Sequence, residues 1–529
     1  MAIDGEDIQL GPWTGGVWYS RPEEDVAEDE ISAMENVRIQ PAGACEKRPG
    51  TVSYKSAAAY TSNPTCTMIA EFTVPPSTTH VVAVFGTAIY QYSAASSPVW
   101  QAITGSLTIT AADDNTFEWA VDEATGTLLA TNGVNPPWKW TGSSTAAAAD
   151  VDSRFTTAEH VAFWDNRVWW GNVDTSYDRL WYSDIADIDT VGATSFYQFG
   201  HPITALVPTR NALTVHTTGG IYTLVPTGNA DIPYQQQQKT GRENSGGVRA
   251  GRAALNGRAI VVLPGDRQLF LRADGIYLWD GEDEVEKKSF QLDLGYWPEL
   301  VTSRLTQAFA VYYPKEAEAW FWVPYGTGQT AMNHIIVYSD RHDCWFGPMT
   351  GSGSYFYRNC AASIDGKPHA GTLNSSGSIG GKVMDHEPNN TYKDDDASAS
   401  GIAIRAYFRT GAPAPEGSGV RLRWLYTRTY YDATGNYNIT VNQESSGVTG
   451  TTKTLNVSGG GFDLDEDNLD EAELGTVRML AYDTDLSEYD PHSSIKFTNN
   501  AINEFFRIRR THPTYKNIGR KRRIGAGVS

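Results

Sequence analysis

The side chains best suited to chemistry are spread thinly along this sequence. Two groups place histidine beside an acid, His342-Asp343 and Asp385-His386-Glu387. These residue types can ligate zinc, but neither group has the spaced set of three or four ligands that a zinc site needs. The sequence also contains no HExxH, GxSxG or Walker A motif, and no GxGxxG after a strand. We therefore predict no catalytic residue, no metal and no cofactor, with both groups at turns or strand ends.

An acidic segment spans residues 462–474, with carboxylates at alternating positions from Asp463 onward. An EF-hand loop requires glycine at position 6 and a bidentate glutamate at position 12, whereas this segment has Asn468 and Leu474 there. An EF-hand is thereby excluded. The segment is interpreted as a solvated acidic loop, and irregular binding of Ca²⁺ or Mg²⁺ stays open.

The C-terminal end has the opposite charge. Residues 505–529 contain no acid and eight basic residues: Arg507, Arg509, Arg510, Lys516, Arg520, Lys521, Arg522 and Arg523. Arg507 and Arg509 alternate as on a strand with one basic face, and residues 519–523 are typical of a flexible tail. These side chains are candidates for contact with a partner or with DNA. A solvated end, docking on an acidic neighbouring subunit and contact with phosphate all stay open.

Composition bounds the class of protein. The chain has 529 residues, and single cores stop growing near about 250–300 residues, so we expect several domains or a closed repeat. The net charge of −20 argues against a general nucleic-acid binder, although not against a surface past which DNA slides. There is no signal peptide and no apolar run of about 18 residues. Cys45, Cys66, Cys344 and Cys360 form no CxxC, which favours reduced thiols and synthesis in a cytosol.

The apolar pattern predicts strands throughout. Short apolar runs of alternating or continuous type are bounded by Gly, Pro, Asn and Asp, as in residues 80–85 and 259–263. A strand of type Gly-x-aromatic returns at Gly220-Ile-Tyr222 and Gly275-Ile-Tyr277. Similar units recur at intervals of about 40–60 residues, close to the length of a four-stranded propeller blade. We therefore predict an all-β fold, a β-propeller of six or seven blades over residues 65–390 with a smaller C-terminal antiparallel β domain.

The remaining segments complete the expected domain organisation. Residues 1–64 are predicted to be an N-terminal arm with the first strands, and residues 391–400 a linker. Residues 401–510 are predicted to form a sandwich-like domain and to supply strands that close the ring. Residues 511–529 are the predicted basic tail. A polar, glycine-rich stretch at 235–247 is either a surface loop or a loop that projects toward a partner or channel.

The N-terminal segment carries a family resemblance. Residues 35–43, Glu-Asn-Val-Arg-Ile-Gln-Pro-Ala-Gly, lead into residues 46–51, Glu-Lys-Arg-Pro-Gly-Thr. This opening resembles that of tail hub or nozzle proteins of short-tailed bacteriophages. Residues 163–172 and 213–222 are similar in style to that family, and residues 507–510 resemble its basic final strand. The motif is specific only in the first fifty or so residues, and it contains no catalytic residue.

The resemblance implies a structural virion protein. It would be made in the host cytoplasm and assemble in the tail as a ring, with six copies expected, below the portal and its adaptor. It would contact tail fibre or spike proteins and form or gate the exit channel for double-stranded DNA. An acidic wall would repel phosphate and so lower friction during ejection.

Three alternatives remain at this point. A tail fibre or spike propeller would bind host glycans through exposed Trp and Tyr. A propeller glycosidase or lyase would use paired carboxylates, for which Asp174, Asp178 and Asp184 are the candidates near aromatic strands. A cellular propeller scaffold is the third.

Overall fold

The structure is a computed structural model that describes residues 5–520 with internal gaps. Outside the described residues lie 1–4, 56–63, 94–99, 144–147, 152–153, 230–231, 240–252, 282–284, 375–379, 396–399, 418–419, 433–434, 436, 446–447, 458–478, 487–488 and 521–529. The acidic segment 462–474, the glycine-rich part of residues 235–247 and the basic residues Lys521, Arg522 and Arg523 therefore fall outside it. No helix among the described residues is long and apolar enough to cross a membrane.

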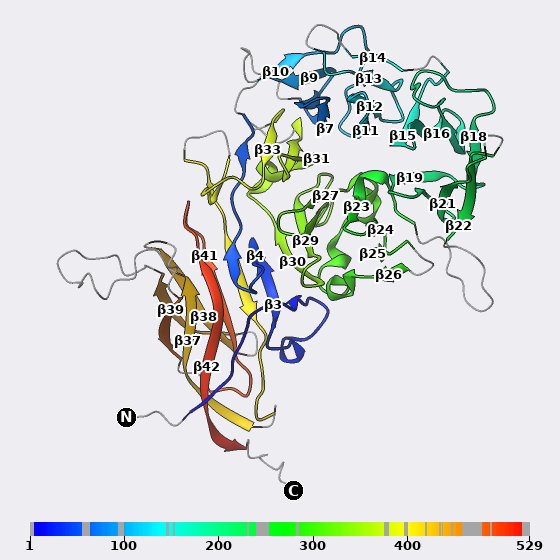
Figure 1. Cartoon of the computed structure of the whole chain (residues 1–529). Coiled ribbons are helices and arrows are strands. Elements are labelled where there is room, and N and C mark those ends of the chain that lie inside the picture. The colour runs from blue at the N-terminus through cyan, green and yellow to red at the C-terminus, as the bar shows by residue number, and fades with distance from the viewer. Residues whose placement is uncertain are drawn as a thin grey trace, which may run out of the picture.

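Seven four-stranded antiparallel sheets form a β-propeller (Figure 1). Blade 1 consists of β7 (Cys66–Val74), β8 (Thr78–Phe85), β9 (Ala88–Tyr92) and β10 (Trp100–Ala102). Blade 2 consists of β11 (Glu118–Asp122), β12 (Thr127–Thr131), β13 (Trp138–Trp140) and β14 (Ala149–Asp150). Blade 3 consists of β15 (Ala158–Trp164), β16 (Arg167–Val173), β17 (Ser176–Tyr182) and β18 (Phe196–Gln198). Blade 4 consists of β19 (Ile203–Pro208), β20 (Leu213–Thr217), β21 (Gly220–Pro226) and β22 (Tyr234–Gln238). Blade 5 consists of β23 (Ile260–Leu263), β24 (Arg267–Arg272), β25 (Gly275–Trp279) and β26 (Val285–Lys287). Blade 6 consists of β27 (Phe309–Tyr313), β28 (Glu318–Val323), β29 (His334–Ser339) and β30 (Cys344–Met349). Blade 7 consists of β31 (Arg358–Ile364), β32 (Lys367–Thr372), β33 (Val383–Asp385) and β6 (Val52–Ser53).

The local sequence explains these hairpins. Asp165-Asn166 and Asp365-Gly366 connect successive strands, and all four residues have positive φ. That conformation defines the two-residue turn whose twist matches antiparallel strands, and Asn, Asp and Gly adopt it most readily. The all-β prediction is confirmed, and the blade number is seven.

The ring is closed by an N-terminal strand. The inner strand β31 of blade 7 packs against β7 of blade 1, and β6 pairs with β33 as the outermost strand of blade 7. The prediction that residues 401–510 close the ring is wrong. Blade 7 takes only three strands from its own stretch of the sequence, and the segment that enters the propeller just before blade 1 supplies the fourth.

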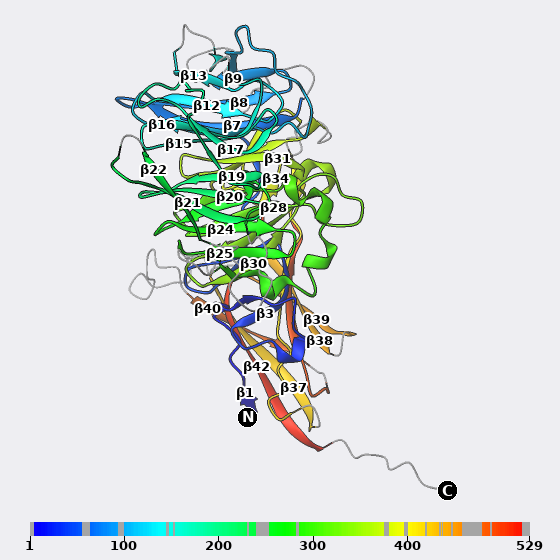
Figure 2. The same cartoon turned by 90° about the vertical axis from the view of Figure 1, so that its right-hand side faces the viewer.

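A second domain contains two six-stranded sheets and lies beside blades 6 and 7 (Figures 1 and 2). Sheet A has the order β4 (Val37–Ile39), β5 (Cys45–Lys47), β42 (Arg507–Arg520), β37 (Val420–Asp432) and β40 (Met479–Asp485), with β1 (Glu6–Asp7) also pairing with β42. Sheet B has the order β2 (Gly16–Val17), β3 (Glu30–Glu35), β36 (Ala406–Thr410), β41 (Ser494–Asn499), β38 (Asn438–Ser445) and β39 (Val448–Asn456). The remaining elements are β34 (Lys393–Asp394), β35 (Ile402–Ala403) and the short 3₁₀ helices η1 (Glu23–Asp25), η2 (Gly257–Ala259), η3 (Ser289–Leu292), η4 (Trp297–Glu299), η5 (Thr302–Gln307) and η6 (Gly353–Phe356).

Both ends of the chain build this domain, which corrects three predicted boundaries. The N-terminal segment before β6 supplies β1 to β5 and is not a separate arm. Residues 391–400 are not a simple linker, because Lys393–Asp394 forms β34 and Asp394 is buried. Residues 511–520 are not a tail, because they continue β42 in pairing with β37. Strand pairs between the two ends of a chain leave no local signal, so the pattern along the sequence missed them.

One apolar core crosses the boundary between the two domains. Leu269 and Trp320 of the propeller belong to the same buried cluster as Trp13, Phe408 and Trp424 of the second domain. The strands β2 and β4, which each end one sheet of the second domain, contact β30 of blade 6. The two domains are therefore packed against each other along blade 6.

Candidate functional site

Two of the eight predicted basic residues are neutralised inside the second domain. The Arg507 guanidinium lies 2.7 Å from a Glu46 carboxylate oxygen and 3.4 Å from Asp432. Arg509 donates a hydrogen bond to Asp432 at 3.0 Å, and Asp432 is only 1 % exposed. Removing one partner of such a group leaves a buried charge uncompensated. Arg507 and Arg509 are thus paired within the chain, while their own side chains stay 32 % and 38 % exposed, so their contact with a partner or DNA stays a prediction.

The other basic residues have different surroundings. The Arg510 guanidinium lies over the Tyr430 ring at 4.5 Å from its centroid, and its Nε is buried without a hydrogen-bond partner. Lys516 is exposed near the distal end of β42. Arg520 ends β42, and its side chain is not among those described. Of the eight, Lys516 is the basic side chain that the structure places in solvent.

The N-terminal motif instead forms a buried junction between the domains, defined here as Asn36, Arg38, Arg48, Glu318, Glu387 and Asp394. Arg38 on β4 lies 3.0 Å from Glu318 of blade 6 and 2.8 Å from Glu387 just after blade 7. The side chains of Arg38 and Glu318 are 5 % and 4 % exposed. Glu318 also accepts a hydrogen bond from the Trp320 indole at 2.9 Å. One arginine thus connects the second domain to two blades.

Arg48 makes the second half of the buried junction. It donates to both carboxylate oxygens of Asp394, at 2.9 and 2.7 Å, and to the Asn36 amide oxygen at 2.7 Å. A further bond reaches the Thr350 carbonyl at 2.7 Å, after blade 6. Paired bonds to one carboxylate fix the guanidinium plane, which lysine could not do.

Gly50 is required beside this pair. A Cβ at Gly50 would lie 1.9 Å from the carbonyl oxygen of Lys393, where no side chain fits. The close approach allows Thr51 to bridge to Asp394 and leads the chain into β6. The motif residues 46–51 therefore both anchor the second domain and close the propeller.

Burial shifts the titration of the buried junction. Burial raises the pKa of Glu387 to about 7, an effect that Arg38 opposes and that Glu318 and Glu46 increase. Burial likewise raises the pKa of Glu318, against the influence of Arg38. One arginine does not fully neutralise two buried carboxylates, so protonation of one carboxylate removes the repulsion between them.

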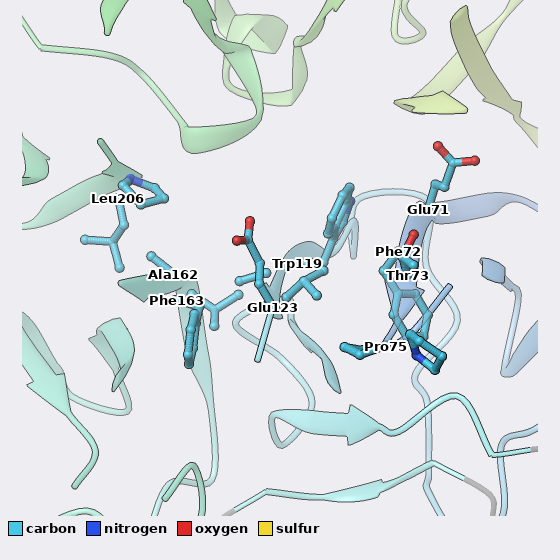
Figure 3. Close-up of a pocket in the computed structure, with 14 residues that line it drawn as sticks. Glu71, Phe72, Thr73, Pro75, Trp119, Glu123, Ala162, Phe163 and Leu206 are labelled. Carbon is cyan, nitrogen blue, oxygen red and sulfur yellow. The ribbon is translucent and has the colours of Figure 1, made fainter. Parts of the chain in front are cut away.

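A pocket of about 700 Å³ lies within the propeller (Figure 3). It is lined from the inner strands of blades 1 to 4, with Trp119 and Phe163 as aromatic walls and Glu71 and Glu123 as carboxylates. Glu71 accepts hydrogen bonds from the Asp365 backbone N–H at 3.1 Å. None of the ion pairs formed by described residues includes Glu71 or Glu123. The arrangement suits a cationic or hydroxyl-rich ligand.

A smaller cavity of about 340 Å³ shares Trp119 with the first pocket and lies among the inner strands. Its wall contains Glu118, which lies 3.1 Å from the buried His160 ring. Burial alone would lower the pKa of His160, but Glu118 raises it above its ordinary value. Both ring nitrogens are engaged, since the second contacts the Ile203 carbonyl at 3.2 Å. His160 is therefore held as part of the wall.

The predicted carboxylate set of an enzyme does not converge. Asp174 accepts bonds from the backbone of Thr156 and Thr157, and Asp178 accepts one from the Gln198 amide at 2.9 Å. Asp184 follows β17, six residues beyond Asp178, which on an extended strand is roughly 20 Å. Glycosidase carboxyl groups lie about 5–9.5 Å apart. In the described part of the chain, no three His, Cys, Asp or Glu side chains group as metal ligands.

Comparisons with known proteins add little to this geometry. No family model matches the chain, and no curated protein matches it. Among solved structures, the WD40 repeats of RRP9 align with 9 % identity and a TM-score of 0.40, and U3-55K with 9 % and 0.41. The computationally designed protein Ika8 aligns with 13 % identity and a TM-score of 0.38. Each alignment covers 64 % of this chain and 98 % of the other. The propeller assignment rests on the strand pairing described above.

The buried junction predicts a large asymmetry between two arginine substitutions. Arg38→Met leaves two buried carboxylates without their charged partner and should lower the free energy of unfolding by about 3–5 kcal/mol. The matched control is Arg428→Met, which removes a pair with Asp483 whose side chains are 46 % and 47 % exposed. That change should cost about 0–1 kcal/mol. Urea unfolding of both variants measures the difference, and equal losses would contradict the assignment.

The raised pKa of Glu387 predicts a pH dependence. The folded state holds its proton up to about pH 7, against an ordinary pKa of 4.5, so this stabilisation is present below pH 4.5 and lost as the pH rises to about 7. In Glu387→Gln, the free energy of unfolding should fall less steeply between pH 4.5 and about 7, by up to about 1 kcal/mol per pH unit. Urea unfolding at several pH values between 5 and 7.5 measures this slope. Glu286→Gln, at a side chain 63 % exposed, should keep the wild-type slope; identical slopes for both variants would refute the assignment.

Proposed function

We propose that this chain is a structural virion protein of a short-tailed bacteriophage. It acts as a ring-forming nozzle or hub of the tail below the portal and adaptor, and it surrounds the exit path of the genome. The N-terminal motif that resembles this family supports the proposal. In the structure, the same motif residues connect the two domains.

The observation that carries the ring is the arrangement of the second domain. Each of its two sheets contacts blade 6 at one end, through β2 and β4. At the other end, the described strand pairing stops at β39 and β40. An edge strand presents unpaired N–H and C=O groups that can pair with another chain. Copies joined through β39 or β40 would hold their propellers in a fixed relation.

The small size of the cavity inside one propeller supports a channel that lies between copies of the chain. The major groove of DNA alone is about 12 Å wide. The axial cavity holds only about 340 Å³ and is walled by Phe117, Trp119 and Phe309. In the proposed ring, the duplex would therefore pass through an opening between copies, with each propeller in its wall. The net charge of −20 would keep such a wall from binding phosphate.

Assembly of the purified full chain tests this function. We expect a particle mass near six times 57.9 kDa by native mass spectrometry, and rings in negative-stain images. Tyr482→Lys on β40 should shift the mass toward one copy, because lysine on an edge strand opposes pairing. Tyr177→Lys in blade 3 is the matched control, since the two tyrosines are 43 % and 54 % exposed. A monomer at all concentrations, together with absence from purified virions, would defeat the proposal.

A host-glycan-binding tail fibre or spike is the second candidate, favoured by the pocket in Figure 3. Aromatic faces stack on sugar rings, and carboxylates accept hydrogen bonds from sugar hydroxyls. A glycan array with the wild-type chain should then show binding, and Trp119→Ala should weaken it by about tenfold. Tyr177→Ala, outside the pocket, should bind as the wild type does. An array without any signal would remove this candidate.

A further inference from the structure

Two cysteines meet at the seam where the propeller closes. Cys66 begins the inner strand β7 of blade 1, and Cys360 lies on the inner strand β31 of blade 7. Their sulfur atoms are 3.7 Å apart. The Cys360 thiol also lies 3.4 Å from the Cys66 carbonyl, and the Cys66 thiol lies 3.3 Å from the Met68 carbonyl. The pair thus joins the first and last blades, which are 294 residues apart in sequence.

The neighbouring strand leaves room for both thiols. A Cβ at Gly371 on β32 would lie 2.6 Å from the Cys66 sulfur and 2.8 Å from the Cys360 sulfur. Both sulfur atoms therefore pack on the same residue without a side chain. A disulfide needs the sulfurs at about 2.05 Å, so from 3.7 Å they must approach by less than about two ångströms.

Access to the pair is one-sided. Cys360 lines the axial cavity of about 340 Å³ and is 5 % exposed, whereas Cys66 is fully buried. A small neutral oxidant that enters along the propeller axis would therefore meet Cys360 first. The remaining two cysteines, Cys45 and Cys344, are also buried and lie on β5 and β30, away from the seam.

We propose that Cys66 and Cys360 are an oxidative modification site, at which a peroxide converts the thiol pair into a disulfide that locks the propeller ring. The Cys360 sulfur attacks hydrogen peroxide, the O–O bond breaks, and the products are a sulfenic acid at Cys360 and one water. The Cys66 sulfur then attacks the Cys360 sulfur and expels the hydroxyl group. The Cys66 proton leaves with it as a second water.

The consequence is covalent closure of a ring that is otherwise closed by strand packing and by the two-residue strand β6. A cross-link between distant residues stabilises by restricting the unfolded chain, and the effect grows with loop length. Burial raises the pKa of the Cys66 thiol, which keeps the reactive thiolate scarce. The pair would therefore stay reduced in a reducing cytosol and close slowly after release into an oxidising medium.

The test uses the purified full chain before and after incubation with hydrogen peroxide, followed by alkylation of remaining thiols. Mass spectrometry without reductant should find one peptide pair that joins Cys66 to Cys360, lighter by two hydrogens. The melting temperature should rise by several degrees and return to its starting value with dithiothreitol. This comparison needs no substitution, so a folding defect cannot obscure it.

Variants separate the seam from the other thiols. Cys45→Ser combined with Cys344→Ser should keep the cross-link and the rise in melting temperature, while Cys66→Ser and Cys360→Ser should each lose both. Peroxide treatment that gives only sulfinic acid at Cys360, or a cross-link without a change in melting temperature, would overturn the proposal. Because the readout is closure within one chain, failure here would leave the proposed ring of copies standing.

Discussion

The buried charge of Arg38 is the constraint on which the relation of the two domains depends. An ion removed from water costs several kcal/mol unless an opposite charge and hydrogen bonds compensate it. Arg38 forms its ion pairs with Glu318 of blade 6 and Glu387 beyond blade 7. A shift of the second domain would therefore leave the buried Arg38 without its charged partners, which disfavours other docking positions. Apolar packing across the same boundary supplies the cohesion, and the ions determine the register.

The same constraint explains why the ring closes through so short a strand. β6 contains only Val52 and Ser53, too few residues for a stable strand on its own. Immediately before it, Arg48 is held by Asp394 and Asn36, and Gly50 lies against the Lys393 backbone. The chain thus enters the propeller already fixed in position, so the entropy lost on pairing β6 with β33 is small. The residues that anchor the second domain and those that close the propeller are therefore neighbours in the sequence.

The sequence could reveal the blades but not this junction. The strands of a blade follow one another along the chain, so their alternation of apolar and polar residues and their turns, such as Asp365-Gly366, are visible in a short stretch of sequence. Arg507 and Arg509 looked free because their partners Glu46 and Asp432 lie 461 and 77 residues away. Charge counted along the sequence reports composition, whereas only the fold decides which charges cancel. The motif at 35–51 is visible in the sequence, but the burial of Arg38 and Arg48, which determines its role, is a property of the fold.

A closed and internally filled propeller changes where a conduit for DNA can lie. In the proposed ring, the conduit would lie between copies, because Phe117, Trp119 and Phe309 line the small cavity among the inner strands of one propeller. Such a ring has to resist outward force at each contact between copies. Continuous β-sheet across that contact, from β39 or β40 to a neighbour, would carry the load along backbone hydrogen bonds. In the proposed ring, the buried ion pairs of Arg38 would then transmit that load from the second domain to blades 6 and 7.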